Sequence, residues 1–108
     1  MLRTLWTRNT ITDDENLVKQ IINRFKKFKI KTHVEKMDNN RFCIWVNFKD
    51  FENVRKEIKK FSLNYLKLKK GVVPSCSFDG RWFIQINTKN VYEIAVKNGK
   101  YEIINYHQ

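Results

Sequence analysis

Two tryptophans that stand close to cationic residues offer the clearest chemistry in this sequence. An indole ring can stack on a nucleic-acid base, and a neighbouring guanidinium can bind a phosphate. Along residues 41–48 two sets of side chains alternate: Phe42, Ile44, Val46 and Phe48 in one set, Arg41, Cys43, Trp45 and Asn47 in the other. A period of two predicts a β-strand with one face on a core and the other toward solvent. We therefore expect Trp45, Arg41 and Asn47 on an outer sheet face.

Similar pairs of aromatic and polar residues recur elsewhere in the chain. In residues 81–87 the apolar phase is Trp82, Ile84 and Ile86, which leaves Arg81 and Phe83 on the outer side. Trp6 and Arg8 fall in a first predicted strand, and Lys31 and His33 fall on the outer phase of a second one. The candidate nucleic-acid-binding residues are Trp6, Arg8, Lys31, His33, Arg41, Trp45, Asn47, Arg81 and Phe83.

The charge of the chain favours an anionic partner. Its 108 residues carry 22 basic and 11 acidic side chains, a net charge of +11. Such an excess indicates phosphate binding, although lysine-rich helix faces are often simply solvated. Two cysteines are too few for a disulfide framework, and no apolar stretch has the length of a membrane helix. We expect a cytoplasmic protein with no membrane association.

The hydrophobic pattern predicts a first series of five elements. Residues 2–8 are the first strand, with Leu5 toward the core and Trp6 facing away, although the opposite register also fits. A capping box from Thr12 to Glu15 begins a helix with an apolar stripe. A second strand at residues 28–35 and a turn at residues 38–40 lead into the strand at residues 41–48. The next helix would be capped by Asp50, with Phe51, Val54, Ile58 and Phe61 as its apolar seam.

This order predicts an α+β fold, a ferredoxin-like plait (βαββαβ) with an antiparallel sheet and both helices on one face. Residues 64–68 or residues 81–87 could supply the closing strand, and residues 71–80 are expected to be a loop. Residues 91–96 and 101–106 flank Asn98-Gly99, which favours a hairpin, with a helix over residues 88–98 as the alternative. We expect a single domain over residues 1–108, with a plait core at about 2–70 and a β-rich extension at about 72–108.

Over residues 2–70 the chain resembles an RNA recognition motif domain. Leu5-Trp6-Thr7-Arg8-Asn9-Thr10 stands at the position of the family's hexamer and agrees at Leu5, Trp6 and Asn9. Residues 41–48 stand at the position of its octamer and agree at Arg41, Trp45, Val46 and Phe48. The resemblance implies that Trp6 and Trp45 stack on bases and that Arg41 contacts a phosphate. The octamer's small residues are replaced by Phe42 and Ile44, and one of its aromatic residues by Cys43.

Signatures of catalysis are weak. The sequence has no glycine-rich phosphate loop and no metal-ligand spacing, so we expect no cofactor and no metal. The leading hypothesis is a non-catalytic protein that binds single-stranded RNA or DNA. One alternative is a protein-interaction or inhibitory module, homodimeric or with another partner, that uses the same sheet face or a sheet edge. A second is a metal-independent ribonuclease that uses His33, Arg41, Arg81 and a tyrosine. Separately, the C-terminal segment could cover Trp6 and Trp45, which would give the two tryptophans a structural role.

Overall fold

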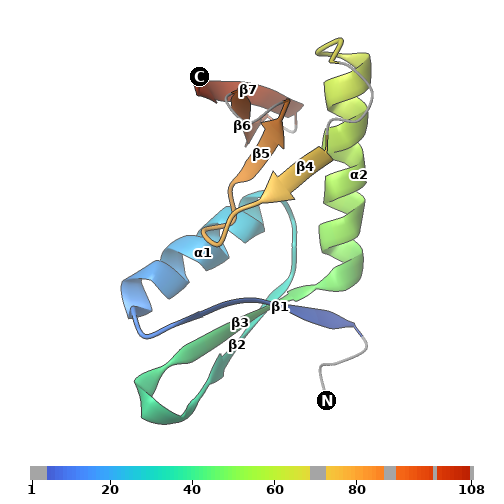
Figure 1. The fold of residues 1–108 in the computed structure, drawn as a ribbon. Helices are drawn as coiled ribbons and strands as arrows, with labels where there is room; N and C mark the ends of the chain where they lie inside the picture. The colour runs from blue at the N-terminus through green and yellow to red at the C-terminus, as the bar shows by residue number, and fades with distance from the viewer. Residues whose placement is uncertain (1–4, 69–72, 87–89, 99, 108) are drawn as a thin grey trace. The chain divides into compact units, whose positions relative to one another are not determined.

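The computed structural model describes residues 5–68, 73–86, 90–98 and 100–107 (Figure 1). The chain divides into two compact units. Unit 1 consists of Met1–Asn53 and Phe78–Gly80, and unit 2 consists of Val54–Ser77 and Arg81–Gln108. Each unit has its own antiparallel sheet, of three strands in unit 1 and of four strands in unit 2. The α+β class is therefore as predicted.

The sheet of unit 1 is built around its central strand. It contains β1 (Trp6–Thr12), β2 (Thr32–Lys36) and β3 (Phe42–Asn47) in the order β1-β3-β2. The predicted hairpin of β2 and β3 is confirmed. Its reversal is the short 3-10 turn η1 (Asp38–Asn40), in which Asn39 has a φ of 63°. Asparagine tolerates this left-handed conformation better than most residues, which explains why the turn forms here.

β1 begins and ends later than the sequence suggested. Thr12 is its last residue and not a helix cap. Asp14 caps the following helix instead, because its carboxylate accepts hydrogen bonds from the backbone N–H groups of Asn16 and Leu17. The register of β1 against β3 shifts between Arg8 and Thr10, which marks a β-bulge. The predicted core residue Leu5 lies before the strand and is exposed, so that prediction was wrong.

Helix α1 (Glu15–Lys27) packs on one face of this sheet, as Figure 1 shows. The predicted apolar stripe is confirmed at Val18, Ile21 and Phe25, which are buried. On the sheet side, Ile44 and Val46 of β3 are fully buried. The start of the second strand was predicted too early, since Phe28 caps α1 and Lys29 turns the chain with a φ of 58°.

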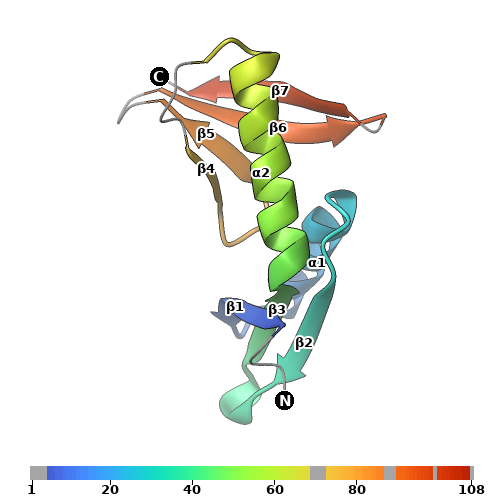
Figure 2. The same cartoon turned by 90° about the vertical axis from the view of Figure 1, so that its right-hand side faces the viewer.

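The sheet of unit 2 contains four strands in sequence order. They are β4 (Val73–Cys76), β5 (Trp82–Gln85), β6 (Val91–Lys97) and β7 (Lys100–His107), and Figure 2 shows them beside helix α2. The predicted strand around Trp82 is confirmed, with Trp82 and Ile84 fully buried. The hairpin of β6 and β7 is also confirmed, so the helix considered for this segment was wrong.

The ferredoxin-like plait is not confirmed. Neither segment considered for its closing strand joins the sheet of unit 1. Among the described residues, 65–68 are outside any helix or strand, and β5 pairs with β4 and β6. Part of the expected loop at residues 71–80 is instead strand β4. Strand pairing depends on distant partners, which the local alternation of side chains does not specify.

Helix α2 (Phe48–Asn64) starts two residues before the predicted cap. The side-chain oxygen of Asn47 accepts a hydrogen bond from the backbone N–H of Asp50 at 3.1 Å, so Asn47 caps the helix. Farther along, Val54 and Ile58 are buried as the seam predicted. These two residues belong to unit 2, where Tyr101 of β7 donates a hydrogen bond to Glu57 at 2.8 Å. The buried residues Val54 and Ile58 of α2 are therefore not part of the core of unit 1, in contrast to the predicted plait with both helices on one sheet.

Gly80 should be hard to replace. It has a φ of 78°, and a Cβ added there would lie 2.8 Å from the Cβ of Arg24 in α1. Both the backbone conformation and the close approach favour glycine. We expect Gly80→Ala to lower the free energy of unfolding by about 1–3 kcal/mol in chemical denaturation. Lys67→Gly, at an exposed residue with a φ of 57°, is the control and should not destabilise the protein. An unchanged denaturation midpoint for Gly80→Ala would contradict the close approach of Gly80 to Arg24.

Tyr101 should ionise only at strongly alkaline pH. Its pKa is raised above the usual value by burial, by its hydrogen bond to Glu57 and by the charge of that carboxylate. Because the pKa is raised in the folded state, this stabilisation is complete below the ordinary pKa of 10.0 and is lost as the pH rises through the folded-state pKa. Tyr101→Phe should cost about 1 kcal/mol at neutral pH and weaken the alkaline loss of stability. Tyr65→Phe, on an exposed ring, is the control.

Candidate nucleic-acid interface

The strand register brings several candidate residues into neighbouring rows. Arg8 of β1 and His33 of β2 both pair with Trp45 of β3. Residues that pair directly across an antiparallel sheet have their side chains on the same face. Arg8, Trp45 and His33 therefore form one row across all three strands. In the adjacent row, Trp6 of β1 pairs with Asn47 of β3.

A ring contact connects the two rows. The rings of Trp6 and His33 are in an edge-to-face arrangement, with centroids 6.2 Å apart and planes at 62°. This is a favourable geometry for two aromatic rings. Because these side chains meet although they come from the two edge strands, they lie on the same side of the sheet. The contact supports the register independently.

These residues lie on the face opposite to α1. Ile44 and Val46 alternate with Trp45 along β3 and are part of the core that α1 covers. We call the opposite side of the sheet the outer face. Its members are Trp6, Arg8, Ile11, His33, Glu35, Cys43, Trp45 and Asn47. The sequence correctly predicted that Trp6 and Trp45 share this face.

Trp6 and Trp45 are half-buried. The indole Nε1 of Trp45 is inaccessible and has no hydrogen-bond partner among the described residues. The polar edge of the ring is therefore turned into the protein, and its accessible part consists of carbon atoms. Such a surface suits stacking, which uses the face of a ring and requires no hydrogen bond.

Cys43 is buried, contrary to its predicted place on a solvent-facing side. It is 2% exposed and is flanked on the outer face by Ile11 of β1 and Glu35 of β2. A short side chain on the central strand is shielded by longer neighbours. Burial raises the pKa of the Cys43 thiol, Glu35 raises it further, and Arg8 acts in the opposite direction. The thiol therefore stays protonated near neutral pH and is a poor nucleophile.

Other candidates lie at the margin of the outer face. Arg41 is exposed beside the β2–β3 turn, where its carbonyl oxygen accepts a hydrogen bond from the N–H of Met37 at 2.7 Å. Lys31 comes just before β2, and its carbonyl oxygen accepts a hydrogen bond from the N–H of Asn47 at 2.9 Å. Asn47 itself is engaged as the cap of α2, so its side chain has a structural role that the sequence analysis missed.

Arg81 and Phe83 belong to unit 2 and not to the outer face of unit 1. The Cζ atom of Arg81 lies 5.6 Å from the centroid of the Phe83 ring. A guanidinium nitrogen of Arg81 is 3.7 Å from a carboxylate oxygen of Glu93, which is buried. The sequence analysis did not single out Glu93. The one feature that could have indicated it is the position of an acidic residue within an apolar strand pattern. Asn87, also expected on this strand, lies outside the described residues.

The residues considered for a ribonuclease come from different units. His33 and Arg41 are in unit 1, whereas Arg81 and all four tyrosines are in unit 2.

Across the described ranges, no cluster of three or more histidine, cysteine, aspartate or glutamate side chains could hold a metal ion. In the same part of the chain, neither helix has the length and apolar character needed to cross a membrane. Comparison with protein families, curated proteins and solved structures gives no match for this chain.

The reactivity of Cys43 tests the geometry of the outer face. In a Cys76→Ser variant, Cys43 should react with a disulfide reagent at about pH 8 at least tenfold more slowly in the folded protein than in denaturant. The reason is that the thiol is buried and its pKa is raised. In the converse Cys43→Ser variant, the half-buried Cys76 should react faster than the native Cys43. Equal rates for folded and unfolded Cys43 would contradict the observed packing.

Proposed function

We propose that the protein binds single-stranded nucleic acid on the outer face of unit 1 and does not act catalytically. The observation that carries this proposal is the cross-strand row of Arg8, Trp45 and His33, with Trp6 packed against His33 in the next row. It combines a cation with two indoles on one sheet face. Bases would stack on the indoles while Arg8 and Arg41 contact phosphates.

The energies are sufficient for moderate affinity. Stacking of a base on an aromatic side chain contributes about 1–3 kcal/mol. Two such stacks with a few phosphate contacts give an affinity in the micromolar range, which corresponds to about 8 kcal/mol. Stacking is tolerant of sequence because every base has an aromatic face. The proposal therefore predicts weak sequence preference.

The overall charge supports binding to a polyanion. The net charge is +11, and most of the excess lies in unit 2, whose acidic residues are Glu57, Glu93 and Glu102. Exposed lysines of α2, such as Lys56 and Lys59, add electrostatic attraction without defining a sequence. The resemblance to the RNA recognition motif favours RNA. Nothing in the stacking chemistry discriminates against single-stranded DNA.

A protein-binding module is the second candidate, and specific side chains favour it. Leu5, Ile11 and Phe48 of unit 1 are 49%, 38% and 50% exposed. The N–H of Phe48 donates a hydrogen bond to the carbonyl oxygen of Leu5 at 2.8 Å, so these two residues are neighbours. Exposed apolar groups of this kind are typical of surfaces that dock on another protein or on a second copy of the chain.

Replacement of Trp6 tests the proposed function. Trp6→Ala should weaken binding of an unstructured oligonucleotide by about 5-fold to 150-fold, because one stack is lost. The measurement is fluorescence anisotropy of a labelled oligouridylate or oligothymidylate at low salt. Tyr65→Ala removes an aromatic ring that is 73% exposed and lies in unit 2, and it should change the affinity less than twofold by the same measure.

The binding measurements, followed by sedimentation where no binding is found, distinguish the two candidate functions. Equal losses for Trp6→Ala and Tyr65→Ala would show that binding does not depend on the outer face. No binding by the unsubstituted protein would reject the proposed function. If sedimentation then shows self-association that Phe48→Ala abolishes, the protein-binding candidate is selected.

A further inference from the structure

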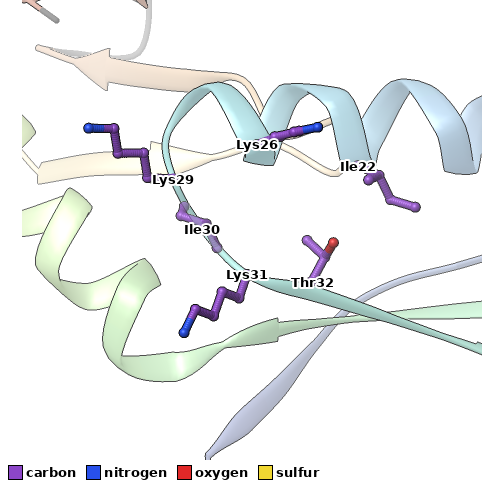
Figure 3. Close-up of a pocket in the computed structure, with 6 residues that line it drawn as sticks. All are labelled: Ile22, Lys26, Lys29, Ile30, Lys31 and Thr32. Atoms are coloured by element: carbon purple, nitrogen blue, oxygen red, sulfur yellow. The ribbon is translucent and has the colours of Figure 1, made fainter.

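A shallow pocket with three cationic side chains lies where α1 turns into β2. Its volume is about 450 Å³, and all of its lining residues belong to unit 1. They are Ile22, Lys26, Lys29, Ile30, Lys31 and Thr32 (Figure 3). No acidic side chain is among them. We call this site the lysine pocket.

The ammonium groups of the lysine pocket have no anionic partner in the part of the chain that the structure describes. Within the described residues, Lys26, Lys29 and Lys31 form no ion pair. Figure 3 shows their ammonium groups pointing in different directions. Like charges separate when no anion lies between them. Each ammonium ends a long flexible chain, so the three can turn toward a bound anion.

The backbone of the pocket is already engaged. The N–H groups of Lys29 and Ile30 donate to carbonyl oxygens of α1, and the N–H of Lys31 donates to the carboxylate of Asp50 at 3.2 Å. The remaining donors are the lysine ammonium groups and the Thr32 hydroxyl. Such a donor set recognises charge and not the shape of a base. It suits a phosphate group.

The pocket lies beside the edge strand β2 on the α1 side of the sheet, and Lys31 connects it to the outer face. Lys31 lines the pocket and also hydrogen-bonds through its backbone to Asn47, which pairs with Trp6. Trp6, Asn47 and Lys31 thus form a continuous line across the sheet. β2 is an edge strand of this sheet, so no further strand separates the line from the pocket. An extended chain that leaves the outer face and passes around the edge of β2 arrives at the three lysines.

We infer that the lysine pocket binds a backbone phosphate of the same nucleic-acid strand that stacks on Trp6. This inference rests on the proposed function and adds a second contact region to it. The strand crosses the sheet from β1 to β2 and places a phosphate among Lys26, Lys29 and Lys31. Short oligonucleotides that occupy only the outer face do not reach the pocket.

The test compares two triple variants with the same loss of charge. Lys26→Gln, Lys29→Gln and Lys31→Gln together empty the pocket of cations. Lys19→Gln, Lys36→Gln and Lys49→Gln together remove three exposed lysines of unit 1 that do not line it. Affinity for an oligothymidylate of about 12 nucleotides is measured by anisotropy over a range of salt concentrations. Circular dichroism establishes that both variants are folded.

The pocket variant should bind the long oligonucleotide about 3-fold to 10-fold more weakly, and the salt slope should fall by about 0.7 for each lost phosphate contact. The control variant should keep its slope within about 0.3 of the unsubstituted protein. A dinucleotide should bind the pocket variant and the control variant equally. Equal behaviour of both variants toward the long oligonucleotide would overturn the inference while leaving the proposed function intact.

A second measurement uses inorganic phosphate and the unsubstituted protein, so it does not depend on whether a variant folds. In the unsubstituted protein at low ionic strength, phosphate should shift the backbone amide signals of residues 29–32 in a saturable manner. Shifts spread evenly over all lysine-rich segments would overturn the pocket as a site. If these residues respond to phosphate but no oligonucleotide binds, free phosphate is the ligand, and the inferred path of a strand is rejected together with the proposed function.

Discussion

The central strand β3 is the constraint on which unit 1 depends. Its alternation sends Ile44 and Val46 into the core beneath α1 and turns Trp45 to the outer face. A shift of one residue would exchange the two sets and expose both aliphatic side chains. The burial of Ile44 and Val46 therefore fixes the register that aligns Arg8, Trp45 and His33. The same hydrophobic contacts that stabilise the unit also assemble its candidate binding surface.

Local patterns predicted the elements whose formation depends on near neighbours. The stripe of α1, the turn at residues 38–40 and the hairpin of β6 and β7 follow from spacing and turn chemistry in short windows. The shared face of Trp6 and Trp45 agrees with the expected phase of Trp6, although the opposite register of the first strand also fitted the pattern and its expected core residue Leu5 is exposed. The bulge between Arg8 and Thr10 did not appear in the pattern, nor did the extension of β1 to Thr12, after which Asp14 caps α1.

Other features depend on distant partners, which explains why they were missed. Residues 64–68 alternate like a strand, but α2 extends to Asn64 and the described residues that follow pair with no strand. Asp50 was a good cap candidate, yet Asn47 lies three residues before it and takes that role. Arg81 and Phe83 had the outward phase that was predicted, but their strand belongs to another sheet. Glu93 beside Arg81 could not be foreseen without strand pairing.

The central claim is that nucleic acid lies on the outer face of unit 1, and amide shift mapping with an unlabelled oligothymidylate tests it most directly. We predict that the largest changes fall on the rows of Trp6, Arg8, His33 and Trp45, including the indole signal of Trp6. Residues of α1 that face the core, such as Ile21, should change little. Shifts confined to α2 and the sheet of unit 2, with the signals of β1 and β3 unmoved, would contradict the account.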